Sequence, residues 1–224
     1  MQFLRIAALG FVAVLSLAAG KANWTATVNV TPEGSHVLGN PEAPAKLTEF
    51  VSYTCSHCAT FQKQSDAPLR IAYIMPGNVS VAVQHVIRDP IDLTVAMLTN
   101  CGKPDGFFQR HHMFLYQQQN WLSKLGGMSD AQRQRWQRGD LRQRLSAVAR
   151  DFDFYALMEQ RGYSRVRVDT CLGDMDVAKK LMAQTQDAGK LGVPGTPSFA
   201  INGALIEDTH NWESLKPWLK AAVD

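Results

Sequence analysis

The chain has 224 residues, of which 46% are hydrophobic and 19% charged, a composition that suits one ordinary globular core. Lys and Arg total 23 against 20 Asp and Glu, and a net charge of +3 is too small to indicate a nucleic-acid-binding protein. Beyond the first 20 residues, no stretch is long and apolar enough to span a bilayer.

The N-terminal segment has the pattern of an export signal. Arg5 supplies a positive charge, and residues 6–19 are apolar apart from Ser16. This run is shorter than the ~20 residues that a membrane-spanning helix needs. We therefore expect residues 1–20 to be a signal peptide, cleaved near residues 20–22, and the mature protein to be a soluble periplasmic protein. The alternative is an uncleaved membrane anchor.

The first predicted elements of the mature chain surround a pair of cysteines. Residues 25–30 alternate in polarity and predict an edge strand or an ordered arm, and residues 46–51 predict a buried strand. A helix is expected to begin at Cys55 and to end before residues 76–78, with a bend at Pro68. Residues 79–86 then predict a second core strand.

The pattern changes to helical periodicity for about 100 residues. Asp89 and Pro90 can start a helix that leads to Cys101, and a second helix is expected from about residue 104. Ser129 and Gln132 predict a capping box for a third helix, which Gly139 and Asp140 could break. Two more helices are expected in residues 152–162 and 174–192. The pair at residues 111 and 112, His-His, is interpreted as packed or surface histidines rather than as a metal site.

The C-terminal part returns to strands. Residues 197–201 and 204–206 predict a hairpin around Asn202 and Gly203, and an amphipathic helix follows from Trp212. Without the helical block, the order of elements is βαβ followed by ββα. The predicted fold class is therefore α/β, a thioredoxin fold with an inserted α-helical domain. Residues 23–90 form its N-terminal part, residues 91–190 the insertion and residues 191–224 its C-terminal part.

Cys55 and Cys58 are the most informative residues of the chain. They lie at the junction of a predicted strand and helix, where unpaired backbone N–H groups and the helix dipole favour a thiolate. The thiolate is the form that attacks disulfides, so this spacing indicates a redox site.

The other two cysteines, Cys101 and Cys171, leave alternatives open. Export favours a structural disulfide between them, whereas two separate buried thiols are the simpler interpretation. A zinc site made from all four cysteines is disfavoured, because these two lie far apart in the sequence and zinc ligands usually come in closely spaced pairs.

Four stretches together resemble the DsbA-type thiol–disulfide oxidoreductases of bacterial periplasms. They are residues 34–44, residues 49–58 with the sequence EFVSYTCSHC, the helical insertion, and residues 192–203 with the sequence GVPGTPSFAING. Two residues depart from the well-known oxidases of the family, which carry proline at position 56 and valine at position 196. Here the residues are Ser56 and Thr196. This leaves the direction of electron flow open.

The resemblance implies a role for each cysteine and for two neighbouring side chains. Cys55 would be the nucleophile and Cys58 its buried partner. His57 would stabilise the Cys55 thiolate with a hydrogen bond, although an exposed, idle imidazole is the alternative. Glu49 would exchange a proton with Cys58; alternatively, it pairs with a lysine. No metal and no resident cofactor is expected.

The resemblance also implies how a substrate is held. Pro197 would be preceded by a cis peptide bond, which would present the backbone of Thr196 beside Cys55. An extended substrate could then pair with that backbone as an added strand, a mode that tolerates many sequences.

The expected function is that of a monomeric periplasmic dithiol oxidase. Its partners would be reduced or unfolded exported proteins and a DsbB-like, quinone-linked membrane protein that reoxidises it. An isomerase or reductase of the same fold is the first alternative. A metal-binding or chaperone module that uses the fold without turnover is the second.

Overall fold

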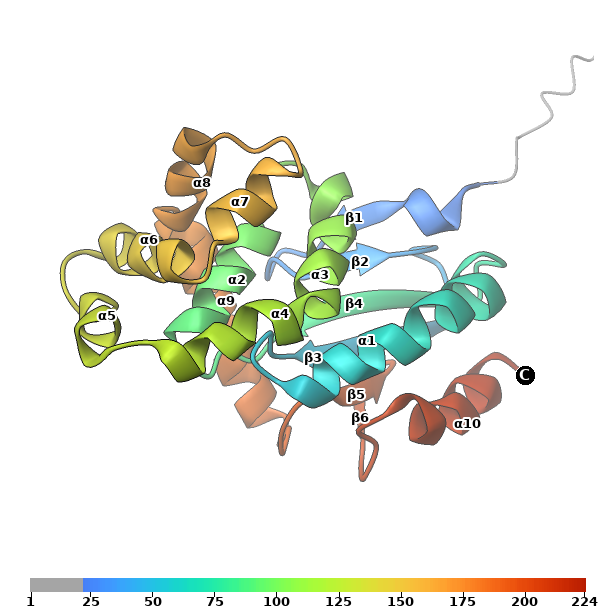
Figure 1. Ribbon diagram of the computed structural model, residues 1–224. Helices are drawn as coiled ribbons and strands as arrows, with labels where there is room; N and C mark the ends of the chain where they lie inside the picture. Colours follow the sequence, from blue (N-terminus) through green and yellow to red (C-terminus); the bar gives the residue numbers. More distant parts are fainter. Residues whose placement is uncertain (1–21) are drawn as a thin grey trace, which may run out of the picture.

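The computed structural model describes residues 22–224, so the expected signal peptide lies outside the described residues. Within this part of the chain, no helix combines the length and the hydropathy that crossing a membrane requires. Figure 1 shows a central sheet with helices packed on it, and a larger group of helices at one end of the sheet.

A six-stranded sheet with the order β1-β2-β4-β3-β5-β6 forms the centre of the fold. Its two central strands, β3 and β4, are parallel, and all the other pairs are antiparallel. The strands are β1 (Val28–Val30), β2 (His36–Leu38), β3 (Ala45–Val51), β4 (Val79–His85), β5 (Ser198–Ile201) and β6 (Ala204–Ile206). The parallel pair requires a crossover, and the helix after the two cysteines provides it.

The alternation of side chains along β3 assigns its residues to two faces of the sheet. Leu47 and Val51 belong to the main apolar core, whereas Phe50 packs with Ala188 and Ala200 in a second cluster. Glu49 shares the face of Leu47 and Val51, so the sequence directs a carboxyl group into the main core beneath the crossover helix.

Two helices complete the thioredoxin-like unit. Helix α1 (Ser56–Leu69) crosses the sheet between β3 and β4, and a π-helical turn, η2 (Arg70–Ile74), extends it. Pro68 lies inside α1 and does not end it. Helix α10 (Trp212–Val223) closes the chain beside α1 and contacts β3.

The inserted segment between β4 and β5 is helical. Its α-helices are α2 (Pro90–Thr99), α3 (Phe107–Tyr116), α4 (Gln118–Leu122), α5 (Asp130–Arg135), α6 (Leu141–Asp151), α7 (Phe154–Glu159), α8 (Arg165–Leu172) and α9 (Met175–Lys190). Short 3-10 helices, η1 (Trp24–Ala26), η3 (Pro104–Gly106) and η4 (Ser123–Gly127), complete the list. A disulfide joins Cys101, just after α2, to Cys171 in α8, with the two Cα atoms 5.4 Å apart.

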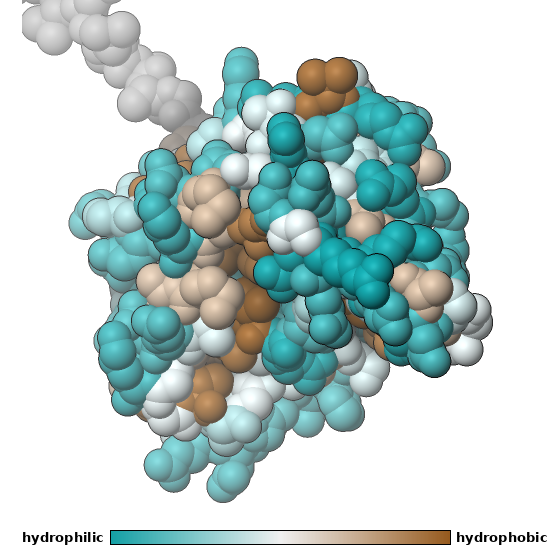
Figure 2. Space-filling model, turned by 90° about the vertical axis from the view of Figure 1, so that its left-hand side faces the viewer, coloured by the Kyte–Doolittle hydropathy of each residue, from teal (hydrophilic) through white to brown (hydrophobic). Residues whose placement is uncertain are grey.

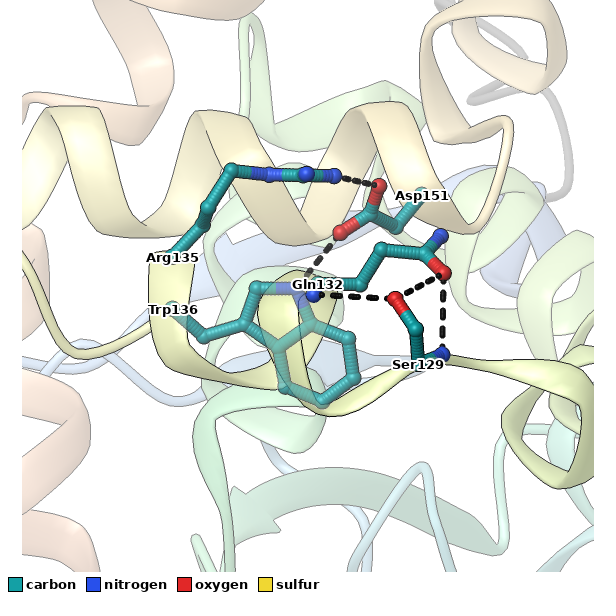
Figure 3. A network of polar contacts seen from close by, with 5 residues as sticks. All are labelled: Ser129, Gln132, Arg135, Trp136 and Asp151. Atoms are coloured by element: carbon teal, nitrogen blue, oxygen red, sulfur yellow. Dashed lines mark hydrogen bonds and ion pairs between the residues drawn. The ribbon is translucent and has the colours of Figure 1, made fainter.

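Helix α5 is held by its own cap and by α6. The Ser129 hydroxyl accepts from the Gln132 backbone N–H, and the Gln132 side chain accepts from the Ser129 N–H, as the predicted capping box requires. Asp151 of α6 then accepts hydrogen bonds from Arg135 and from the Trp136 indole (Figure 3). The side of the molecule that carries α5 and α6 faces the viewer in Figure 2. Its surface is largely hydrophilic, with a narrow apolar strip in a central hollow.

Strand β2 and helix α8 are among the elements that the sequence pattern does not predict. Strand β2 lies between Gly34 and Gly39, which both have positive φ. Helix α8 lies where only a connection was expected. The helix predicted from Ser129 is broken at Gly139, which has φ 88° and separates α5 from α6.

Candidate active site

Cys55 is the N-cap residue of α1, reached by a tight turn from the end of β3. Its backbone is still extended, with φ −91° and ψ 117°, so its side chain lies beside the free N–H groups of the first helical turn. The Cys55 sulfur is 3.0 Å from the carbonyl oxygen of Thr196, to which a protonated thiol donates. Residues 141 positions apart therefore meet at the reactive sulfur.

The pKa of Cys55 is lowered to about 4 in the dithiol form. A hydrogen bond from the Cys58 thiol is the largest cause, and the backbone N–H groups of His57 and Cys58 add to it. Burial of the sulfur opposes the shift. The Thr196 hydroxyl acts in the same direction as Cys58 but more weakly, and its Oγ1 makes no well-aligned hydrogen bond. Cys55 is therefore a thiolate at neutral pH.

Cys58 has the opposite character. It is completely buried one turn into α1, and burial raises its pKa well above the ordinary value. The hydrogen bond it gives to Cys55 and the charge on that sulfur raise the pKa further. The two thiols thus share one negative charge unequally, with the charge on the outer sulfur and the proton on the inner one.

The turn that carries Cys55 is fixed by residues of the helical insertion. The Asp92 carboxylate of α2 accepts from the Ser52 hydroxyl at 2.6 Å and from the Tyr53 backbone N–H at 2.8 Å. The Gln118 amide of α4 donates to the carbonyl oxygens of Tyr53 and Cys55, at 2.7 and 2.8 Å. The insertion therefore positions the nucleophile, a role the sequence analysis did not assign to Asp92 or Gln118.

A shallow groove of about 320 Å³ runs beside Cys55. It is lined by His57, Pro194, Gly195, Thr196 and His210. The Thr196–Pro197 peptide bond is cis. The His210 ring nitrogen Nδ1 lies 2.8 Å from the Pro197 carbonyl oxygen, so a proton on Nδ1 would tie the loop to the segment before α10. An extended polypeptide could lie in this groove with its cysteine at the Cys55 sulfur.

The structure places the two side chains differently, with His57 at the surface and Glu49 buried beneath α1 close to Cys58. The His57 imidazole is exposed and makes no hydrogen bond to Cys55 within residues 22–224. Only its backbone N–H acts on the sulfur. Glu49 is 4% exposed, and no ion pair with a lysine reaches it among the described residues. Burial raises its pKa to about 8.

Across residues 22–224, no group of three or more His, Cys, Asp or Glu side chains is arranged to hold a metal ion. The two thiols are instead arranged as donor and acceptor of one hydrogen bond, which suits exchange chemistry at sulfur.

Residues 31–221 match the family described as Thioredoxin, and the chain belongs to this family. A protein-disulfide isomerase from Novosphingobium aromaticivorans, known from its crystal structure, has 45% sequence identity to this chain. The two structures match with a TM-score of 0.81 over 85% of this chain and 97% of that one. The α-DsbA1 of Wolbachia pipientis has the same fold at 20% identity, with a TM-score of 0.65 over 87% and 93% of the two chains. The predicted thioredoxin fold with a helical insertion is confirmed.

A curated relative is more distant. A provisionally named protein-disulfide oxidoreductase of Rickettsia bellii is 26% identical over 178 residues. The match covers 79% of this chain but spans only 60% of the length of that protein. The Novosphingobium and Rickettsia proteins are thus described as a protein-disulfide isomerase and a protein-disulfide oxidoreductase.

The alkylation rate of Cys55 is expected to follow a titration with its midpoint near pH 4, because only the thiolate reacts. Reduced protein would be treated with iodoacetamide between pH 3 and 9, with peptide mapping to locate the label. Cys58 should remain unlabelled at neutral pH, since it is buried and protonated. A midpoint near the ordinary thiol pKa of about 8.5 would contradict the site geometry.

Proposed function

We propose that this protein is a thiol–disulfide oxidoreductase of the periplasm that donates its Cys55–Cys58 disulfide to exported proteins. The observation that carries the proposal is the pair of sulfurs at the start of α1, one held as a thiolate and the other as a buried thiol. A disulfide is a strong oxidant when its reduced form is stabilised, and ionisation of Cys55 stabilises the reduced form.

Each turnover exchanges one disulfide for another. A substrate thiolate attacks the Cys55 sulfur, the Cys55–Cys58 bond breaks, and Cys58 leaves with the electron pair. The second thiolate of the substrate then attacks the substrate sulfur of the mixed disulfide and releases Cys55 as a thiolate. The substrate gains a disulfide and the enzyme gains two electrons. A DsbB-like membrane protein is the proposed reoxidant, and the protein is proposed to act as a monomer.

A disulfide isomerase is the second candidate, and two observations favour it. Thr196 stands where the well-known oxidases have valine, and the 45% identical relative is described as a protein-disulfide isomerase. An isomerase would work from its reduced form, attacking wrong disulfides with the Cys55 thiolate and leaving after rearrangement.

One pair of measurements distinguishes the two candidates. The Cys55–Cys58 couple would be titrated against glutathione, and the protein would be assayed on a fully reduced and on a scrambled disulfide-containing substrate. An oxidising potential with fast oxidation of the reduced substrate is the expected result. A reducing potential with efficient unscrambling would overturn the oxidase assignment. Zinc retained stoichiometrically at the two thiols, with no turnover, would indicate a metal-binding module instead.

A further inference from the structure

The buried face of α1 carries polar residues where a core-facing helix usually carries leucine. Gln62 lies four residues after Cys58, and Ser65 and Asp66 lie three and four residues after Gln62, so the four residues share one stripe of the helix. Gln62 and Ser65 are 5% and 2% exposed. The stripe leads from the buried thiol to Asp66, eight residues along the helix, a rise of about 12 Å.

Glu49 faces this stripe from the sheet below. Its Oε1 is buried and has no hydrogen-bond partner among residues 22–224. A buried oxygen of this kind is normally paired with protein or with ordered water. Glu49 also acts electrostatically on Cys58, so the two groups are close.

A small cavity lies between Glu49 and the stripe. Its volume is about 30 Å³, and its polar lining comes from Glu49, Gln62, Ser65, Asp66, Arg70, His111 and His112. A polar cavity holds a water molecule when it offers at least about 10–15 Å³, so this one has room for about two. Water there would give the unpaired Glu49 oxygen its partner and connect it to α1 and α3.

The outer end of the cavity is formed by half-buried charged and titratable groups. His112 Nε2 of α3 is 3.5 Å from Asp66 Oδ1, and these two side chains are 20% and 25% exposed. Arg70 donates to the same Asp66 oxygen at 2.8 Å. Burial lowers the pKa of His112 to about 4, with Asp66 opposing and Arg70 adding to the shift. A neutral imidazole offers one N–H and one lone pair, so it can take up a proton and pass one on.

His111 is not available for the same task. Its Nε2 is 3.1 Å from the Gln62 side-chain oxygen, and its Nδ1 is 2.9 Å from the Tyr53 hydroxyl. Both ring nitrogens are therefore occupied by fixed neighbours. His111 forms the wall of the cavity, and His112 is the titratable side chain of α3 that borders both the cavity and the solvent-exposed groups.

We propose that this cavity is the path by which the proton exchanged at Glu49 moves to and from solvent, and that His112 with Asp66 forms its outer end. The inference rests on the proposed function. When Cys58 leaves as a thiolate, the Glu49 carboxylic acid gives it a proton and becomes a carboxylate. The cavity then returns a proton from solvent to Glu49. The sequence runs in reverse on reoxidation.

The proposed path would let protons reach Glu49 from solvent when the groove beside Cys55 is covered. In the mixed disulfide, a bound polypeptide would cover the side of Cys55 formed by His57 and Thr196. The cavity is bordered instead by the half-buried Asp66 and His112, and Asp66 lies eight residues along α1 from Cys58, a rise of about 12 Å. Protons could therefore be exchanged while substrate remains bound. In this scheme His112 is a positioning residue for proton transfer and touches neither sulfur.

The test compares His112→Ala with Gln109→Ala, an exposed position of the same helix that does not line the cavity. The rate at which dithiothreitol reduces the oxidised protein would be measured by rapid quenching with an alkylating reagent, at low buffer concentration. We expect His112→Ala to slow this step about tenfold, less than the full effect of a positioned acid–base group because water can partly replace the side chain. Added imidazole should restore the rate, and Gln109→Ala should match the wild type.

The equilibrium constant with glutathione separates this role from a structural one. His112→Ala should leave that constant unchanged, because a proton path alters rates and not end states. Wild-type rates in His112→Ala at every buffer concentration, or a loss that imidazole does not reverse, would overturn the proposal. If His112→Ala does not fold, His112→Gln takes the same test with the same expected slowing. An unreactive wild-type disulfide would instead refute the proposed function itself.

Discussion

Cys55→Ser is expected to abolish thiol–disulfide exchange, because a serine hydroxyl is not ionised at neutral pH and cannot form a mixed disulfide. Oxidation of a reduced test protein by the purified variant, monitored by alkylation of remaining thiols, should fall to the uncatalysed rate. Ser56→Ala is the matched control, since Ser56 is the exposed neighbour in the same helical turn and its hydroxyl contacts neither sulfur. Turnover by Cys55→Ser at the wild-type rate would refute the site.

Cys58→Ser should give a different and complementary result. The Cys55 thiolate would remain reactive, but the inner thiol that releases a bound partner would be missing. The variant should therefore attack disulfide-containing proteins, each attack releasing one sulfur of the partner as a thiolate, and accumulate covalent complexes that are visible as bands that disappear on reduction. Complexes in equal amount with Cys55→Ser would show that another cysteine makes them.

Loss of the Cys101–Cys171 disulfide is expected to lower the free energy of unfolding by about 4 kcal/mol, from the loop of 70 residues that the bond closes. The bond joins the end of α2 to α8, and α2 supplies the Asp92 contacts that hold the active-site turn. Cys101→Ala with Cys171→Ala would be unfolded in urea beside the wild type, with both proteins oxidised at Cys55 and Cys58.

The matched control is the wild type with its active-site disulfide reduced and the Cys101–Cys171 bond intact. A decrease below about 1 kcal/mol in the double variant would show that the packing of α2, α6 and α8 holds the insertion without the bond. A similar loss in the reduced wild type would show that the active-site disulfide contributes as much to the free energy of unfolding as the structural one.

The central strands, α1 and the C-terminal hairpin could be predicted because their periodicity and turn residues agree with their final state. Strand β2 could not, since three residues carry too little alternation and its place depends on pairing with β4, more than 40 residues later. Helix α8 was missed because Arg165, Arg167 and Asp169 interrupt its apolar pattern. The side of α8 that is buried depends on its contacts with the other helices of the insertion.

The residues of the site also fall into two groups, those that a local motif carries and those that act from far along the chain. The two cysteines, Thr196 and Pro197 could be found because local motifs carry them. Asp92 and Gln118 could not, because they act on the Cys55 turn from 39 and 63 or more residues away, and neither stands in a recognisable pattern. The predicted His57 hydrogen bond stays a prediction, and in this structure the His57 side chain is exposed.

The unequal ionisation of the two sulfurs has a consequence for where the protein works best. Reducing the disulfide takes up two electrons but, above about pH 4, only one proton, because Cys55 stays ionised and Cys58 does not. Its midpoint potential therefore falls by about 30 mV per pH unit, whereas ordinary dithiols below their pKa fall by about 59 mV. The drive to oxidise such thiols accordingly weakens as the surroundings become acidic and strengthens toward neutrality.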